Sequence, residues 1–256
     1  MRTCAIVRTC VHAAGYRAYG SSGRYNRGMS PQPEFAALVA LADAVKLLAA
    51  AATGCCPVPY GPQRRLILAV DIIGFNDPRR DDEIQLALRR ALYLILTRAF
   101  AAAQVPWPRI QHEDRGDGVL MTLPAEVPAT VVTGPLLAHV RDELRLHNRL
   151  SSAAAQFGLR VSAHIGEVHH DEHGLVGRAV NHVFRLLEAP AFKDRAGCGT
   201  GLLAVILSDA VHSTLLRDGP TEYQPVIAVL KETRSPAWVH ITDDTHSHTD
   251  VIEASA

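Results

Sequence analysis

The sequence predicts an α/β sandwich in which helices pack on a mixed β-sheet, and three observations support this fold class. The apolar run 66–70 is typical of a strand that is buried on both faces. Apolar residues recur at helical spacing over 81–103, with acidic residues in the first turn. The strand-like segments 109–115 and 119–123 flank the turn Gly116-Asp117-Gly118, which predicts a hairpin.

The remaining segments continue this alternation of helices and strands. The first six elements, in the order β-α-β-β-α-β, correspond to a ferredoxin-like core. The later elements are expected to be a helix over 133–157, a strand over 159–165, a helix over 177–188, a strand over 202–207, a helix over 208–216 and a closing hairpin over 226–230 and 237–241.

A histidine-rich segment, 169–173, precedes the helix expected over 177–188. It contains three histidines and two acidic residues, which are residue types that bind metal ions. Consecutive side chains seldom converge on one ion, however, and the segment lies between a strand and a helix. We therefore interpret it as a solvated loop.

Composition shifts divide the chain into four parts. Residues 1–28 lack apolar periodicity and are expected to be a disordered leader. Residues 29–63 are expected to form an Ala-rich helix followed by a linker that is rich in proline. The main domain is expected over 64–241, and 242–256 is a polar tail.

The overall composition argues against several classes of partner. The 26 basic and 26 acidic residues balance, so no global field favours nucleic acid or an anionic membrane. The five cysteines are odd in number and form no CxxC pair, which argues against a disulfide framework or a structural zinc site. Asp43 and Lys46 interrupt the Ala-rich segment, so we expect no membrane span and a cytoplasmic location.

Two aspartates are candidate metal ligands. Asp71 ends the first strand, and Asp117 lies at the hairpin tip, 46 residues later. Adjacent strands would bring them together, and two close carboxylates favour a hard cation such as Mg²⁺ or Mn²⁺ between them. A phosphate-bearing substrate would complete the coordination. The alternative is that both residues serve as ordinary strand-end and turn residues.

A helical pair of donors is the second candidate constellation. Asn181 and Arg185 are four residues apart and therefore project from one face of the expected helix. The guanidinium of Arg185 suits the oxygens of a phosphorus under attack, and the amide of Asn181 suits a ribose or an attacking hydroxyl. The alternative is that Arg185 is a surface residue of an amphipathic helix.

Three segments together resemble the class III adenylate/guanylate cyclase catalytic domain, in the same order and at similar spacing. They are DIIGF at 71–75, RGDGV at 115–119 and GRAVNHVFR at 177–185. The resemblance covers about 66–241 and implies an enzyme that converts a nucleoside triphosphate to a 3′,5′-cyclic nucleotide and pyrophosphate. It also implies a homodimer in which Asp71 and Asp117 of one subunit face Asn181 and Arg185 of the other.

The same resemblance assigns roles to further residues. Two ions, Mg²⁺ or Mn²⁺, would be held by Asp71, Asp117 and the backbone of Ile72, while Asn181 and Arg185 would stabilise the transition state. The substrate would contact Ile73, Gly74, Phe75, Glu113, Arg160 and Lys231. Arg160 is equally plausible as an exposed strand residue, and Lys231 precedes Glu232 where relatives usually have glycine.

The base-reading positions depart from the family pattern. Glu113 is the residue type seen in guanylate cyclases, whereas the second position falls near Gly174, which has no side chain. Purine and pyrimidine nucleotides therefore both stay open as substrates. An alternative function is a catalytically degenerate cyclase domain that serves as a nucleotide-binding regulatory or dimerisation module. Phosphodiester hydrolysis is disfavoured, because no additional His/Asp ligand cluster accompanies the carboxylates.

Overall fold

The computed structural model describes residues 62–197, 202–215, 222–230 and 233–242. The chain divides into two units, Met1–Pro57 and Val58–Ala256, and the described residues belong to the second. The leader expected over 1–28, the Ala-rich helix and the tail beyond Thr242 lie outside the described residues. Those boundaries therefore stay predictions.

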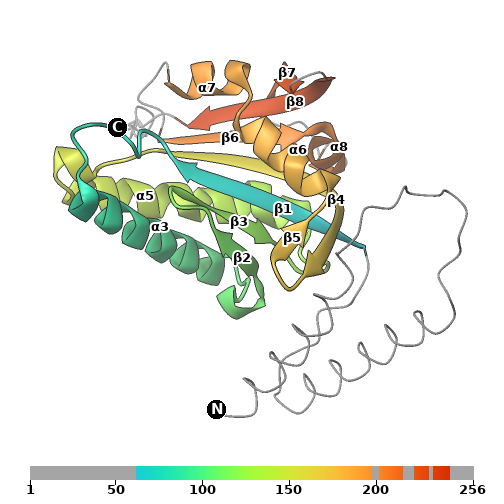
Figure 1. The fold of residues 1–256 in the computed structure, drawn as a ribbon, viewed down its shortest axis with the longest axis horizontal. Coiled ribbons are helices and arrows are strands. Elements are labelled where there is room, and N and C mark those ends of the chain that lie inside the picture. The colour runs from blue at the N-terminus through green and yellow to red at the C-terminus, as the bar shows by residue number, and fades with distance from the viewer. Residues whose placement is uncertain (1–61, 198–201, 216–221, 231–232, 243–256) are drawn as a thin grey trace, which may run out of the picture. The chain divides into compact units, whose positions relative to one another are not determined.

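An eight-stranded mixed sheet organises the second unit (Figure 1), which confirms the predicted fold class. Its strands lie in the order β2-β3-β1-β4-β6-β8-β7, and β5 pairs with β4 off this path. The pair β4 and β6 is parallel, and the other pairs are antiparallel. The strands are β1 (Gln63–Ile72), β2 (Gln111–Asp114), β3 (Gly118–Thr122), β4 (Leu159–Asp171), β5 (Gly174–Val176), β6 (Leu203–Ser208), β7 (Gln224–Leu230) and β8 (Thr233–Thr242).

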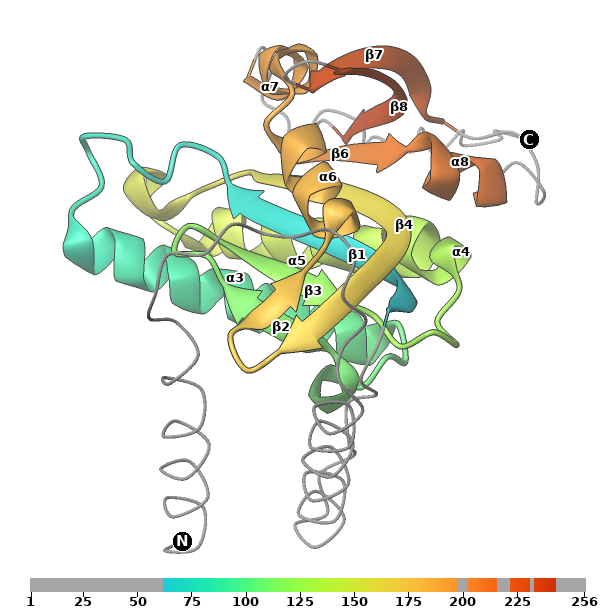
Figure 2. The same cartoon turned by 45° about the vertical axis from the view of Figure 1, so that its right-hand side comes forward.

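Helices cover both faces of the sheet, as Figures 1 and 2 show. On one face lie α3 (Asp82–Ala102) and α5 (Leu137–Leu150), and on the other lie α6 (Arg178–Leu187) and α7 (Pro190–Gly197). Strand β1 serves both layers, because Leu66, Leu68 and Val70 pack with α3 and α5 while Ile67 and Ala69 pack with α6. The prediction that this strand is buried on both faces is confirmed.

The shorter helices connect these layers. They are η1 (Trp107–Arg109), α4 (Ala129–Val131), η2 (Val132–Leu136), η3 (Ala153–Ala155) and α8 (Asp209–Leu215). Of the connecting elements, α8 agrees with the helix expected over 208–216. Helix α7 was not predicted, because its eight residues contain little apolar periodicity. No helix among the described residues is long and apolar enough to cross a membrane.

The helix expected over 133–157 is shorter and less regular than predicted. Its first turn, η2, is wound as a π-helix with Pro135 inside, which lacks the N–H that a regular turn needs. Helix α5 then ends at Leu150, and Ser151 after it is extended. The side-chain oxygen of Asn148 accepts from the N–H of Phe157 at 3.0 Å, and its amide donates to the Phe157 carbonyl at 2.8 Å. Asn148 thereby turns the chain toward β4.

The histidine-rich segment is not the predicted loop. Strand β4 continues to Asp171 and forms a hairpin with β5. The Asp171 carboxylate accepts hydrogen bonds from the backbone N–H of His173 and Gly174, at 2.7 and 3.1 Å, which closes the turn. Residues 169–173 are nevertheless exposed, and the described residues contain no group of three or more His, Cys, Asp or Glu side chains that could hold a metal ion.

Candidate active site

The ladder between β1 and β3 places Asp71 beside Asp117. Asp71 lies opposite Gly118, and the backbone N–H of Ile72 donates to the carbonyl of Asp117 at 3.0 Å. Gly118 permits this close approach, because a Cβ at that position would lie 2.1 Å from the carbonyl oxygen of Val70. Asp71 near the end of β1 and Asp117 in the turn just before β3, the two predicted metal ligands, therefore lie next to each other at one end of the sheet.

The Asp71 carboxylate is buried and already engaged. Only 7% of the residue is exposed, and Arg160, which lies opposite it on β4, donates two hydrogen bonds to its oxygens at 3.0 and 2.5 Å. Burial raises the pKa of Asp71 to about 6; Arg160 opposes this shift, and the charges of Asp117 and Glu188 add to it. At neutral pH the carboxylate is ionised and paired with the guanidinium.

The donor set at this end of the sheet fits a divalent cation. Asp117 and Glu188 lie close enough to Asp71 for their negative charges to raise its pKa, although burial and Arg160 have the larger effects. Two carboxylates with a neighbouring backbone carbonyl, that of Ile72, are the hard oxygen ligands that Mg²⁺ and Mn²⁺ prefer. Because the described residues form no group of three side chains that could hold a metal ion, water or a phosphate would have to complete the coordination.

The turn that follows β1 is held by an arginine that sequence reasoning missed. The guanidinium of Arg80 donates to the carbonyls of Ile73 and Gly74, at 3.0 and 2.7 Å, and to that of Gln156 at 2.7 Å. Gly74 adopts a left-handed conformation, with φ of 68°. The backbone of the predicted substrate residues Ile73, Gly74 and Phe75 is thereby fixed next to Asp71.

An open cavity of about 520 Å³ lies beside this turn. Phe75 and Asn76 from the turn, Gln85 and Arg89 from α3, and Asp117 from the hairpin tip contribute to its lining. One candidate metal ligand thus borders a space large enough for a nucleotide phosphate chain.

The hairpin tip that carries Asp117 is anchored to α3 through Asp114, a residue with no role in the sequence analysis. Arg89 donates to both Asp114 oxygens, at 3.0 and 2.6 Å, and to the carbonyl of Gly116. Tyr93 and the N–H of Gly116 also donate to Asp114, at 2.8 and 2.9 Å. These hydrogen bonds, that of Arg89 foremost, hold the pKa of Asp114 at about 2. The ion pair between Arg89 and Asp114 could not be predicted from a local pattern, because 25 residues separate the two in the sequence.

The donor pair Asn181 and Arg185 lies on the exposed face of α6. The opposite face of the helix packs on the sheet through Val180, Val183 and Leu187. Within the described residues, neither side chain forms a hydrogen bond or an ion pair with Asp71 or Asp117. The described chain therefore shows no direct bond between the predicted donors and the predicted metal ligands.

The two positions that the family resemblance assigns to base reading, Glu113 and Gly174, are brought together, but in an unexpected way. The Glu113 carboxylate accepts hydrogen bonds from the backbone N–H of Leu175 and from Arg115, both at 2.5 Å. A Cβ on Gly174 would lie 2.2 Å from a Glu113 oxygen, so Glu113 fills the space that a side chain at position 174 would need. Glycine at position 174 thus has a local explanation. Lys231, the remaining predicted substrate residue, lies outside the described residues.

Comparison with known proteins identifies the fold. No protein-family model matches the sequence, and no curated protein matches it either. Among solved structures, an adenylate/guanylate cyclase/hydrolase from Silicibacter pomeroyi is 18% identical, with a TM-score of 0.54 over 72% of this chain and 99% of that one. The guanylate cyclase domain from Catenaria anguillulae, solved with GTP, is 17% identical, with a TM-score of 0.50 over 71% and 97% of the two chains. A bacterial light-regulated adenylyl cyclase is 16% identical, with a TM-score of 0.52 over 86% and 71%. The chain therefore has the fold of the adenylate/guanylate cyclase catalytic domains that its three motifs resemble.

Proposed function

We propose that the protein is a nucleotidyl cyclase that converts a nucleoside triphosphate to a 3′,5′-cyclic nucleotide and pyrophosphate. The observation that carries this proposal is the juxtaposition of Asp71 and Asp117 at one end of the sheet, beside the open cavity and the turn 73–75. Enzymes with this fold include an adenylyl and a guanylyl cyclase, and one such domain was solved with GTP. Burial and carboxylate crowding at Asp71 favour a cation in the same place.

In the proposed reaction the ribose 3′ oxygen attacks the α-phosphorus. A new P–O bond forms, the bond to the β-phosphate oxygen breaks, and the hydroxyl proton is lost to solvent. Asp71, Asp117 and the carbonyl of Ile72 would hold two ions, Mg²⁺ or Mn²⁺, which supply activation of the hydroxyl and neutralisation of the leaving pyrophosphate. The fixed backbone of 73–75 would orient the triphosphate.

Arg160 has two tasks in this scheme. Without a cation, its guanidinium neutralises the buried Asp71 carboxylate. If Asp71 held an ion, the guanidinium would give up at least one carboxylate oxygen and would be available to the triphosphate, the role that the family resemblance assigns to it. The contacts of Arg160 would therefore differ between the metal-free and the metal-bound protein.

Catalysis in this proposal requires a homodimer. Asn181 and Arg185 are exposed and make no bond with Asp71 or Asp117 of their own chain, so the partner's pair would complete each site. Asn181 would position the ribose, and Arg185 would stabilise charge on the α-phosphate oxygens as the bond breaks. A monomer would then bind metal without turnover.

The test is incubation of purified protein with ATP, GTP, CTP or UTP and Mn²⁺, followed by chromatography of the products. A cyclic product from one of them is expected, and its absence with a dimer confirmed would refute catalysis. Mixing inactive Asp71→Asn with inactive Arg185→Ala tests the shared site. Random exchange of subunits should restore about a quarter of wild-type activity, because half of the dimers then contain one intact site.

A second candidate function is favoured by the state of Glu113. Its carboxylate is occupied by the Leu175 N–H and by Arg115, and Gly174 offers no second base-reading side chain. On this alternative the domain binds nucleotide for regulation or dimerisation and has lost turnover. Titration calorimetry distinguishes the two, because the regulatory module predicts heat of nucleotide binding in the presence of metal without any cyclic product. If no heat is observed either, the nucleotide sensor is excluded as well.

A further inference from the structure

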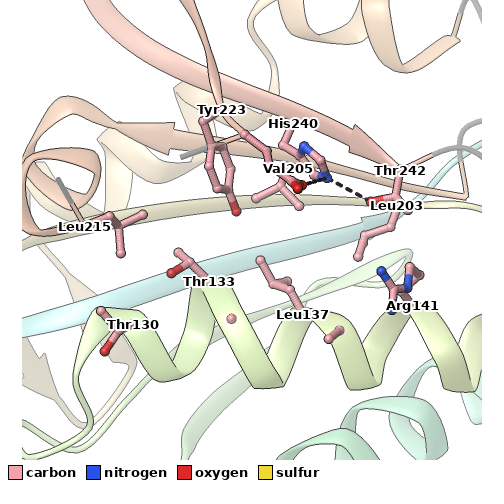
Figure 3. A pocket seen from close by; sticks show the side chains of 13 residues that line it. Thr130, Thr133, Leu137, Arg141, Leu203, Val205, Leu215, Tyr223, His240 and Thr242 are labelled. Atoms are coloured by element: carbon pink, nitrogen blue, oxygen red, sulfur yellow. Dashed lines mark hydrogen bonds and ion pairs between the residues drawn. The ribbon is translucent and has the colours of Figure 1, made fainter. Parts of the chain in front are cut away.

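A cavity of about 360 Å³ lies on the sheet face opposite the side chain of Asp71 (Figure 3). It is partly open and lies between η2 and α5 on one side and β6 and β8 on the other. Leu203 and Val205 of β6 line it and belong to the core layer of α3 and α5. Arg160, which binds Asp71, lies opposite Ala204 in the ladder between β4 and β6, and the side chain of Ala204 belongs to the layer of α6. The sheet thus separates this cavity from Asp71.

The hydroxyl of Tyr223 points from the strand side of the cavity toward η2 and α5 (Figure 3). Burial raises the pKa of Tyr223 well above its usual value, with a smaller contribution from the charge of Glu222, so the hydroxyl stays protonated. Among the residues that the structure describes, this hydroxyl forms no hydrogen bond. The hydroxyl borders the cavity without a partner among the described residues, so it is a donor that a ligand in the cavity can reach (Figure 3).

Arg141 presents a second set of donors from α5. Its Nε donates to the Asp142 carboxylate at 3.0 Å, and the described part of the chain supplies no hydrogen-bond partner to its two terminal nitrogens. In Figure 3 the guanidinium extends from α5 toward Thr242 on the facing strand. The Thr242 hydroxyl lies 3.2 Å from His240 Nε2, so both groups border the same end of the cavity.

The wall between these donors is apolar. It is formed by Leu137, Leu203, Val205 and Leu215. An apolar wall with a few convergent polar groups is the usual composition of a small-molecule site, and the volume lies at the lower end of the range of about 300–1,000 Å³ for such sites.

We propose that this cavity binds a small organic monocarboxylate with an apolar body. A carboxylate accepts hydrogen bonds only, which matches the donors of Arg141 and Tyr223, and an apolar body matches the leucine and valine wall. The one acidic residue of the lining, Glu222, has a side chain that is 87% exposed and lies 3.8 Å from His240. Solvent screens its charge, so it sets no barrier to an anion near Arg141.

The experiment measures binding of 4-phenylbutyrate to the full-length protein by ligand-observed NMR and calorimetry, with 4-phenylbutylamine as the matched cation. The carboxylate is expected to bind and the amine to bind at least 10-fold more weakly. Failure of the carboxylate to bind at millimolar concentration would overturn the proposal. Nucleotide and metal are absent throughout, so the result does not depend on the cyclase reaction.

Three variants locate the binding. Tyr223→Phe is expected to weaken the carboxylate about 5-fold to 10-fold, and Arg141→Gln at least 10-fold, as the loss of a neutral and of a charged hydrogen bond predicts. Ala138→Leu fills the cavity from α5 without removing a donor and should abolish binding. Arg149→Gln, on an exposed position of the same helix, is the control and should have no effect. Circular dichroism confirms that each variant is folded. Binding that is unchanged in the first three variants places the carboxylate elsewhere and overturns the proposal.

Discussion

Replacing Arg160 with glutamine tests the balance of charges around Asp71. The substitution removes both hydrogen bonds from a guanidinium whose side chain is 16% exposed, and it leaves a carboxylate whose side chain is 10% exposed without its counter-charge. Breaking a buried ion pair in this way costs about 3–5 kcal/mol, and the remaining exposure favours the lower end. For a domain of this size each kcal/mol shifts Tm by about 2–4 °C, so we expect a decrease of roughly 6–12 °C.

Added Mn²⁺ should reverse much of this loss. On the proposed function, a cation would compete with Arg160 for Asp71 in the wild type, whereas in Arg160→Gln the carboxylate would be available. A cation at 100 times its Kd adds about 2.7 kcal/mol of stability, close to the amount that the substitution removes. The gain in Tm with Mn²⁺ should therefore be larger for the variant than for the wild type.

The assay is thermal unfolding of EDTA-treated protein with and without MnCl₂. Asp71→Asn is the matched control, because it keeps Arg160 and removes the charged ligand, and it should show little response to the metal. A Tm of metal-free Arg160→Gln within about 1 °C of the wild type would contradict the buried-pair argument. Equal Mn²⁺ shifts in the variant and the wild type would show that the cation does not use the carboxylate that Arg160 holds.

Three further predictions address the support of the site. Arg89→Gln should release the hairpin tip, so activity with Mn²⁺ should fall at least 10-fold. Tm should change little, because the Arg89 and Asp114 side chains are about one third exposed or more. A Tm loss that matches the activity loss would argue against a positioning role. Gly118→Ala should cost at least about 2 kcal/mol, since its Cβ meets the Val70 carbonyl. Denaturant unfolding measures this cost, and Gly134→Ala, which meets nothing within 4 Å, should be harmless; equal effects of the two would refute the clash. Burial, with the charges of His182 and Arg64, lowers the pKa of His164 from 6.5 to about 4. As pH falls, His164 is therefore protonated in the unfolded chain before it is protonated in the folded one. The free energy of unfolding should decrease as pH drops from 6.5 toward 4. His164→Gln should flatten that slope in unfolding curves measured at each pH, and an unchanged slope would assign it to other groups.

Local patterns in the sequence predict the frame of the fold because they report burial directly. The run 66–70 alternates between two core layers, and the acidic first turn of α3 includes its N-cap, Asp81, whose carboxylate accepts the N–H of Ile84 at 2.9 Å. The extension of β4 to Asp171 had no such signal, because its last residues are exposed on both faces and polar. Propensity alone therefore favoured a loop there.

The residues of the candidate site also fall into those with a local sequence pattern and those without one. Asp71 and Asp117 were predicted because a strand end and a tight turn are local features, and one helix and one strand between them allow the chain to return beside β1. The Arg160 pair with Asp71 joins residues 89 positions apart, and the Arg80 bond to Gln156 joins residues 76 apart. Such contacts depend on which strands become neighbours, which the residue pattern of a single chain does not state.

The position of β1 in the sheet has a consequence for how the protein is made. β1 is the first strand of the described residues to leave the ribosome, yet its neighbour β4 follows almost 90 residues later. At a synthesis rate of about 5–20 residues per second, its apolar run 66–70 waits on the order of 5–20 s for that partner. During this interval an open hydrophobic edge invites pairing with another nascent chain. Expression at low temperature or with a chaperone that shields exposed strands should therefore raise the yield of soluble protein.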